Sequence, residues 1–239
     1  MDIYGISEIR DLLENNTYPG RGIIIGKTGD GTRAVAAYFI MGRSQNSRNR
    51  VFTEKDGAVF TEPFDASRVQ DPSLIIYAAL RQYENHLIVT NGNQTDTIYE
   101  GLKRGMSFNK ALEMRAFEPD VPNFTPRISG MLTFENGNFS YQMSILKSID
   151  AQGSACARYG FSYPSMPGLG HFIHTYVQDG DPIPTFQGEP ERVAIGDDID
   201  EITDEIWNAL NEDNKISLYV RTVDLASGKA ESRLVNKNQ

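Results

Sequence analysis

The stretch Gly22-Ile-Ile-Ile-Gly-Lys-Thr-Gly-Asp-Gly31, with the apolar run Ala34–Met41 that follows it, decides the fold class of this chain. Its isoleucines form a short apolar run, which is typical of a buried strand. Thr28-Gly-Asp-Gly31 is a turn sequence, and a second apolar run follows it directly. The stretch therefore predicts a buried β-hairpin, the first of several in the chain.

Further hairpins are predicted along the sequence. The segment Leu74–Tyr83 is ambiguous, because Asp71-Pro72 could open a helix. Its apolar side chains alternate with other residues, however, and this favours a strand that turns into a second strand at His86–Thr90. Glu135-Asn-Gly-Asn138 is another hairpin turn. The remaining predicted strands are Val51–Glu54, Ala58–Glu62, Ile128–Phe134, Phe139–Leu146, Ala155–Phe161, Phe172–Val177 and Lys215–Val220.

Helices are few in this pattern. Ile199–Leu210 is amphipathic, with an isoleucine or leucine on one face at nearly every turn. A short helix is predicted from Ser7 to Asn15, another from Thr95 or Asp96 to Gly105, and another from Ser107 to Phe117. Many hairpins with a few helices predict an α+β fold with layered antiparallel sheets.

The composition limits the class of protein. The chain has 239 residues, 39% of them hydrophobic, and a formal net charge of -9. No run approaches the roughly 20 apolar residues that span a bilayer, and the N-terminus lacks the pattern of a signal peptide. The single cysteine, Cys156, excludes an internal disulfide framework. We therefore expect a cytoplasmic globular protein of one large or two small domains that binds neither membrane nor nucleic acid.

An arginine cluster is the most informative functional signal. Gly42-Arg-Ser-Gln-Asn-Ser-Arg-Asn-Arg50 places three arginines in nine residues of an acidic protein. A guanidinium group matches a phosphate or carboxylate with two parallel hydrogen bonds, which lysine cannot do. The cluster predicts a site for one small anion. The alternative is a solvated turn whose arginines pair with surface acids.

A second candidate segment is Asn91-Gly-Asn-Gln-Thr-Asp-Thr-Ile98, where a strand ends and a helix begins. Free backbone amides and the positive end of the helix dipole meet there. Its amides, hydroxyls and carboxylate could bind ribose or a purine edge. The alternative is an ordinary helix cap.

A third candidate is the proline-rich loop Glu118-Pro-Asp-Val-Pro-Asn-Phe-Thr-Pro-Arg127. It holds two carboxylates two residues apart, and its prolines can fix an acid or base at small entropic cost. A linker with incidental charge is the alternative. No metal site is expected, because His171 and His174 point to opposite faces of a predicted strand.

Together these blocks resemble the archaeal-type IMP cyclohydrolase family, which also has bacterial members. The resemblance covers about residues 20 to 180, and its motifs occur in the expected order. The matching motifs are Gly20-Arg21, Gly26–Gly31, Arg43-Ser44 with Arg48, the strand of Tyr77, Asn91-Gly92 with Thr95–Ile98, Thr125–Ile128 and, more weakly, Thr175-Tyr176.

The family's fold implies an Ntn-hydrolase-like, four-layer αββα sandwich. We expect one domain over residues 1–239, with residues 1–19 as a helical extension. The predicted first strand begins Arg21-Gly-Ile, so no Thr, Ser or Cys stands there as a processed N-terminal nucleophile. The implied reaction closes the ring of 5-formamidoimidazole-4-carboxamide ribonucleotide to IMP with loss of water, the last step of de novo purine synthesis.

The resemblance also implies roles for individual residues. Arg43 and Arg48 would hold the substrate's phosphate, Tyr77 would stack on the heterocycle or donate to the oxyanion, and Arg127 would orient a carboxylate. The carboxylate that relays the proton is Glu118 or Asp120. The other substrate-binding residues are Arg21, Asn91, Thr95 and Asp96.

No cofactor is implied, and the partner is a small purine ribonucleotide. A homo-oligomer is left open. The alternatives are another amide- or nucleotide-directed hydrolase on the same scaffold, or a non-catalytic nucleotide-binding protein.

Overall fold

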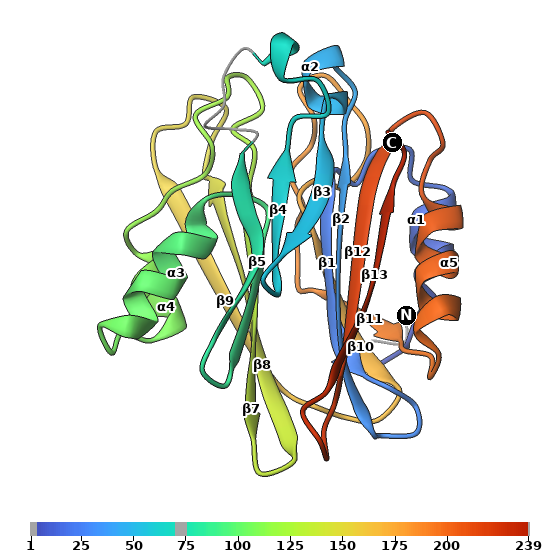
Figure 1. Ribbon diagram of the computed structural model, residues 1–239. Helices are drawn as coiled ribbons and strands as arrows, with labels where there is room; N and C mark the ends of the chain where they lie inside the picture. The colour runs from blue at the N-terminus through green and yellow to red at the C-terminus, as the bar shows by residue number, and fades with distance from the viewer. Residues whose placement is uncertain (1–3, 70–75, 239) are drawn as a thin grey trace.

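The computed structural model describes residues 4–69 and 76–238, which form two antiparallel sheets (Figure 1). The six-stranded sheet has the order β11-β10-β1-β2-β12-β13, and the seven-stranded sheet runs β3-β4-β5-β6-β7-β8-β9. The strands are β1 (Arg21–Lys27), β2 (Arg33–Met41), β3 (Val51–Lys55), β4 (Ala58–Glu62), β5 (Tyr77–Tyr83), β6 (His86–Thr90), β7 (Arg127–Glu135), β8 (Asn138–Ser148), β9 (Cys156–Pro164), β10 (Leu169–His174), β11 (Glu191–Ala194), β12 (Lys215–Asp224) and β13 (Ala230–Asn236).

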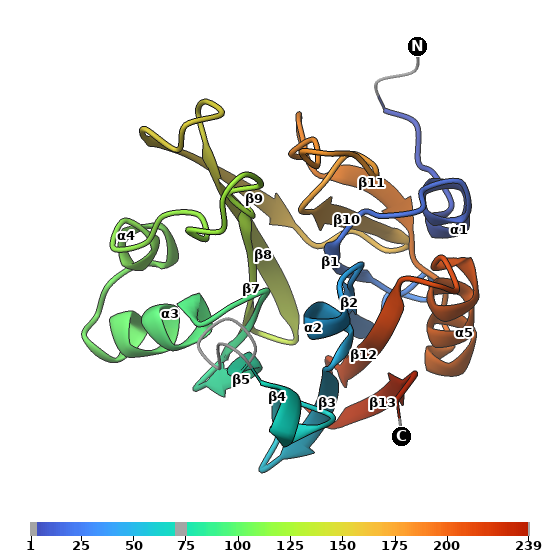
Figure 2. The same cartoon turned by 90° about the horizontal axis from the view of Figure 1, so that it is seen from above.

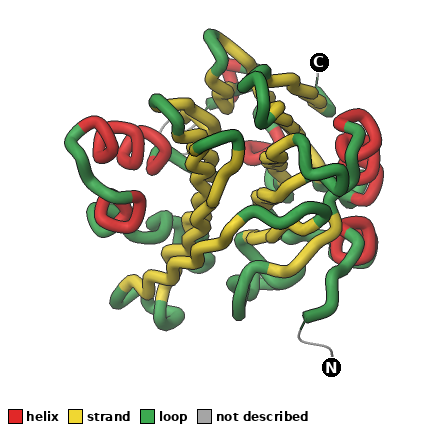
Figure 3. The backbone as a smooth tube through the Cα atoms, turned by 90° about the horizontal axis from the view of Figure 1, so that it is seen from below, coloured by secondary structure: helices red, strands yellow, loops and turns green. Residues whose placement is uncertain are grey.

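Helices cover the outer faces of both sheets, so that the molecule has four layers (Figure 2). Helices α1 (Ile9–Glu14) and α5 (Ile199–Ala209) lie on the six-stranded sheet, and α3 (Gln94–Lys103) and α4 (Phe108–Leu112) lie on the seven-stranded sheet. Helix α2 (Gln45–Arg48) and a 3-10 turn at Ala66–Arg68 lie at one end of the sandwich. The view from the opposite end shows the same separation of helices from sheets (Figure 3).

The hydrophobic core has three parts, and β2 contributes side chains to two of them, one on each face of its sheet. Tyr38 and Ile40 face the other sheet in the central core, whereas Phe39 and Met41 face α1 and α5. Because both faces of this strand are buried, it reads as a continuous apolar run instead of an alternating one. A smaller core lies between the seven-stranded sheet and α3 and α4.

Most predicted elements are confirmed, including the three predicted hairpins, as far as they lie in the described residues, and the α+β class. The helix predicted from Ser107 to Phe117 is wrong beyond Leu112. Past that residue the backbone bonds run from residue i to i−3, and Phe117 turns to contact the Phe124 ring edge-on. Residues 71–75, which include the first part of the ambiguous segment, lie outside the described residues, and its described part is the strand β5.

Three strands differ from the prediction. The strand expected at Phe172–Val177 lies earlier, at Leu169–His174, because Thr175 and Tyr176 leave the sheet to bond Arg21 and Pro19. The strands β11 and β13 were not predicted. Both are edge strands, and most of their residues are only partly buried, so they lack a clear apolar pattern. Within the described residues, no helix has the length and apolar character needed to cross a membrane.

Candidate active site

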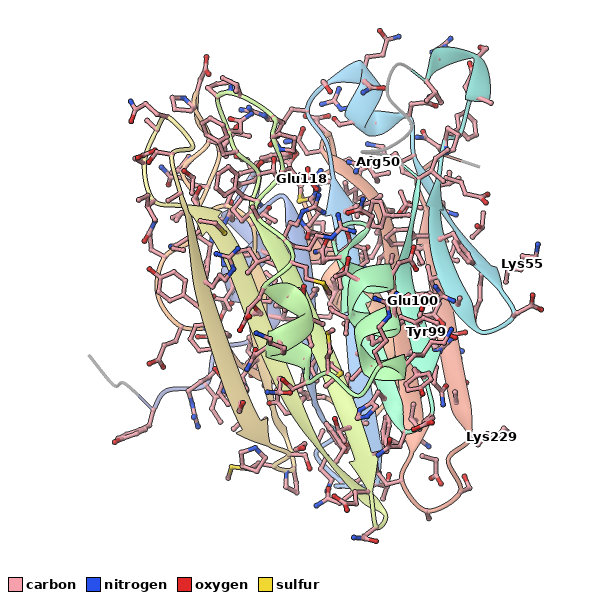
Figure 4. All side chains as sticks on the ribbon, turned by 90° about the vertical axis from the view of Figure 1, so that its left-hand side faces the viewer. Arg50, Lys55, Tyr99, Glu100, Glu118 and Lys229 are labelled. Carbon is pink, nitrogen blue, oxygen red and sulfur yellow. The ribbon has the colours of Figure 1, made fainter. Side chains whose placement is uncertain are left out.

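Charged and phenolic side chains collect at one end of the sandwich. Arg21, Tyr77 and Arg127 are the first residues of β1, β5 and β7. Antiparallel pairing places the starts of these strands at the same end, where Figure 4 shows Glu118 and Arg50 close together. Residues from distant parts of the chain therefore meet at one end of the sandwich.

Two arginines lie side by side in this cluster. Arg50 is only 1% exposed, and its Nε donates to the Ser47 carbonyl at 2.7 Å. Its Nη2 donates to the Met41 carbonyl at 3.2 Å. Burial lowers the pKa of Arg50, and the positive charge of Arg21 lowers it further. The Arg21 Nε is buried and has no hydrogen-bond partner among the described residues. The pair is thus a positive site with a free donor, which an anionic or carbonyl oxygen would satisfy.

A buried carboxylate faces this positive charge. Glu118 is 5% exposed, and its Oε1 lies 4.0 Å from Nη1 of Arg127. Burial raises the pKa of Glu118, although the Arg21 and Arg127 charges act in the opposite direction. The Arg127 Nη1 donates to Gln94 Oε1 at 2.7 Å. A carboxyl group that resists ionisation and lies near two cations is a candidate to accept or deliver a proton.

Gly92 makes this arrangement possible. A Cβ at this position would lie 2.5 Å from the Arg127 Nη1 and 2.7 Å from the Gln94 Oε1. No side chain fits there without displacing one of them. Glycine at position 92 therefore lets the Arg127 guanidinium group and Gln94 pack closely against the end of β6.

Tyrosine hydroxyls complete the cluster. The hydroxyls of Tyr77 and Tyr38 are 2.9 Å apart, and both rings are buried. Burial raises the pKa of Tyr38, and Tyr77 adds to the effect, so this phenol stays protonated. On the other side, the Tyr176 hydroxyl lies 2.6 Å from Thr125 Oγ1, and burial raises the pKa of Tyr176 to about 12. The phenols can therefore act as hydrogen-bond donors.

Asp120 differs from Glu118 although it is only two residues away. Its Oδ1 accepts from the Thr125 backbone at 2.7 Å, and its Oδ2 accepts from Thr125 Oγ1 at 2.5 Å. It is half-buried. These bonds fix the proline-rich loop and engage both Asp120 oxygens, whereas Glu118 faces the Arg127 guanidinium group at 4.0 Å.

The other predicted residues lie around the cluster with partners of their own. Arg43 forms an ion pair with Asp179 and also donates to the Gly180 carbonyl at 2.7 Å. Arg48 donates to the Gly42 carbonyl at 3.0 Å and to Asn214 at 3.1 Å. Both guanidinium groups retain some exposure near α2.

The predicted ribose-binding residues are likewise engaged. Asn91 donates to the Pro126 carbonyl at 2.8 Å and accepts from the Ile128 backbone at 2.9 Å. Thr95 Oγ1 lies 2.7 Å from Thr90 Oγ1, and both are buried. Asp96 is exposed and pairs with Arg81 at 2.6 Å on the outer side of α3. Asn91 reaches the cluster through Gln94, whose Nε2 donates to Asn91 Oδ1 at 2.9 Å, whereas the exposed Asp96 lies outside it.

Sequence reasoning missed four members of the site: Arg50, Tyr38, Gln94 and Tyr176. Arg50 stood inside the arginine cluster but received no role, and the Thr175-Tyr176 pair was noted only as a weak match. Tyr38 gave no signal, because a tyrosine in an apolar strand is more often a core residue. The pairing of β1 with β2 and with β10 brings Tyr38 and Tyr176 to the site, and the bond from Arg127 holds Gln94 there.

The fold and the buried charges define an α+β sandwich protein with a polar site at one end of its two sheets. The chain belongs to the family described as IMP cyclohydrolase-like protein, whose model matches residues 18–228. The IMP cyclohydrolase of Methanopyrus kandleri is 30% identical over 181 residues, which cover 71% of this chain and 89% of that protein. The IMP cyclohydrolase of Methanococcus aeolicus is 28% identical over 163 residues, 66% of this chain and 74% of its own length.

Proposed function

We propose that this chain is an IMP cyclohydrolase, which closes 5-formamidoimidazole-4-carboxamide ribonucleotide to IMP and releases water. The family match and the named relatives support this activity. The observation that carries it is the cluster at one end of the sandwich that joins the buried Arg50, Glu118 and Tyr77 to Arg21, whose Nε is buried. Its mix of fixed cations, a carboxyl group and phenol donors matches the needs of a dehydrating ring closure.

We further propose that the four layers are an Ntn-hydrolase-like scaffold used without its usual nucleophile. In that fold the first strand begins with a Thr, Ser or Cys. Here β1 begins with Arg21-Gly22-Ile23. The reaction does not need a covalent nucleophile, because both reacting groups are on one molecule and catalysis can come from positioning.

The chemistry assigns distinct tasks to these residues. The carboxamide nitrogen attacks the formyl carbon, and negative charge develops on the formyl oxygen. The free Arg21 Nε and the Tyr77 hydroxyl are donors suited to that oxyanion. Ring closure then removes one proton from the carboxamide nitrogen and one from the formamide nitrogen, and the formyl oxygen leaves as water.

Glu118 is the better candidate for these proton transfers. Its raised pKa suits a group that accepts a proton from nitrogen and returns it to the departing oxygen. Asp120 is favoured less, since both its oxygens already accept bonds from Thr125. Arg127, held by Gln94, would orient the Glu118 carboxyl group.

Substrate binding would involve the periphery of the cluster. Arg43 and Arg48 remain our candidates for the phosphate, which would displace Asp179 and Asn214 from their guanidinium groups. The contact of ribose with Asn91, Thr95 or Asp96 remains a prediction, and each of these would have to exchange an existing hydrogen bond.

A spectrophotometric cyclisation assay without added metal tests the proposal. We expect IMP formation above the uncatalysed rate and a loss of at least about tenfold in kcat/KM in Arg21→Met, since hydrogen bonds from a charged donor contribute roughly 1.5–3 kcal/mol. Arg104→Met, at the exposed C-terminal end of α3, is the matched control and should keep full activity.

Two other results would redirect the proposal. Ribonucleotide binding without turnover would indicate a non-catalytic protein or a different reaction on this scaffold. Equal effects of Arg21→Met and Arg104→Met would show that the site lies elsewhere.

A further inference from the structure

The four edge strands of the two sheets, β11, β13, β3 and β9, are not equally protected against pairing with a strand of another chain. The edge strand β11 is covered by the N-terminal segment, because the Ser7 backbone donates to the Arg192 carbonyl and accepts from the Ala194 amide, both at 3.0 Å. These two bonds occupy the Arg192 carbonyl and the Ala194 amide, which would otherwise be free at the edge of the sheet. A second chain cannot add to the sheet there without displacing residue 7.

The edges β3 and β13 protect each other. They lie next to one another where the two sheets meet (Figure 2). The Asn236 side chain on β13 accepts from the Phe52 amide at 2.8 Å and donates to the Phe52 carbonyl at 3.0 Å. Ser232 on β13 also donates to Glu54 on β3 at 3.0 Å. This side of the sandwich is thus closed by side-chain bridges.

The remaining edge, β9, has no such cover. It pairs with β8 on one side over its whole length. Across the described part of the chain, the backbone of residues 158–164 makes no hydrogen bond to any element other than β8. A strand of this length spans about 30 Å at roughly 3.4 Å per residue. Such an edge is a template for another strand unless charges or bulges block it.

The composition of β9 favours a second copy of the same chain. Its sequence, CARYGFSYP, has no acidic residue in a protein of net charge -9, so two copies repel each other least along this strand. Exposed apolar side chains lie on and near it: Tyr159 is 48% exposed, Ile149 directly after β8 is 61% exposed, and Met166 after β9 is 52% exposed. An apolar, nearly uncharged edge is the composition expected of an interface core.

We propose that β9 pairs antiparallel with β9 of a second copy about a twofold axis at Gly160, joining two seven-stranded sheets into one. Gly160 is the middle residue of β9 and has no side chain to obstruct the axis. In this register Tyr159 faces Phe161 of the partner subunit, an aromatic cross-strand pair. Arg158 faces Ser162 of the partner subunit, so no like charges meet. Because the pairing consumes the exposed β9 edge of both copies, the assembly closes as a dimer.

The register makes the proposal testable with charges of opposite sign. Ser162 is exposed on the face of the sheet that carries Arg158. Ser162→Lys would place a lysine opposite Arg158 twice per dimer, and Ser162→Asp would place a carboxylate there. We expect the dissociation constant of the dimer to rise about fivefold for the lysine variant and to fall about fivefold for the aspartate variant. Ser140→Lys is the control, because Ser140 is exposed on the same face but lies on β8, which is paired on both sides.

Sedimentation equilibrium of the full chain measures these constants. We expect a particle with the mass of two 26.7-kDa chains, weakened by Ser162→Lys, tightened by Ser162→Asp and unchanged by Ser140→Lys. Circular dichroism confirms that each variant is folded. A wild-type protein that is monomeric throughout, or a dimer that all three variants leave equally stable, overturns the proposal.

Amide hydrogen exchange locates the interface independently. Protection of residues 156–164 should increase with protein concentration, while protection of the mutually covered strands β3 and β13 should not. Concentration-dependent protection confined to another strand would refute pairing through β9. None of these measurements depends on ring-closing activity, so the dimer and the proposed function can fail separately.

Discussion

The substitution Glu118→Gln should remove activity and yet raise stability. It keeps the size and shape of the side chain and deletes only its charge. At the 4.0 Å that separates Glu118 Oε1 from Arg127 Nη1, the attraction is about 4 kcal/mol with an effective dielectric constant of about 20. Removing a carboxylate from water costs several kcal/mol in the opposite direction. The raised pKa of Glu118 indicates that this cost of burial is the larger of the two.

The pH dependence follows from the sign of that shift. The folded protein holds the Glu118 proton to a higher pH than the unfolded chain, whose carboxyl group titrates near 4.5. Below about pH 4.5 the side chain is neutral in both states and costs nothing. As the pH rises through the folded pKa the charge appears and lowers stability, and the loss is complete above it. The stability difference between variant and wild type should therefore grow as the pH rises above about 4.5 and vanish in acid.

Relieving a strained active-site charge commonly yields about 0.5–2 kcal/mol, and 1 kcal/mol raises the Tm of a chain this long by roughly 2–4 °C. We therefore expect Glu118→Gln to melt a few degrees higher at pH 7 while kcat falls by about 10²–10⁴-fold. Asp120→Asn is the matched control: it weakens two hydrogen bonds from Thr125 and should melt lower.

Thermal unfolding by circular dichroism at pH 4 and pH 7, with single-turnover cyclisation, measures both effects. A Tm lowered by Glu118→Gln at pH 7 would mean that attraction to the arginines outweighs the cost of burial, and the reasoning above would be wrong. An unchanged kcat would remove Glu118 from the proton transfers.

Three further changes test other contacts. Tyr77→Phe should lower kcat more than it raises KM in steady-state assays, and should cost about 1–3 kcal/mol in urea unfolding because the Tyr38 hydroxyl loses its partner. Asn91→Ala leaves the Ile128 amide without its acceptor, so we expect a loss of roughly 1–3 kcal/mol and a lower Tm; an unchanged Tm would contradict this. His171 has its pKa lowered to about 4 by burial and by the Arg192 charge, so the folded state resists its protonation. Stability should fall by roughly 3 kcal/mol as pH drops from 6.5 towards 4, and His171→Phe should remove part of that slope in urea unfolding followed across this range.

The amino-acid sequence by itself determined the layered α+β architecture and most of its elements. Hairpin turns such as Asn136-Gly137 and runs such as Ala34–Met41 carry a local signal, because turn geometry and burial of both faces act over a few residues. Helix α5 was predictable within one residue for the same reason, since its isoleucines repeat with the helical period. The sequence also held the motifs that resemble the family, including those of Arg21, Tyr77 and Arg127.

Only the tertiary structure decided which of these residues meet. From the sequence, Glu118 and Asp120 are equally good candidates for the proton-relaying carboxylate. In the structure, Asp120 bonds to Thr125, and Glu118 faces the arginines. Arg50 and Tyr38 enter the site because antiparallel pairing brings the end of β2 beside the start of β1. The free edge of β9 is likewise invisible in sequence, because protection of an edge depends on what lies beside it in space. Long-range pairing and burial set these charges and contacts, and no local pattern encodes them.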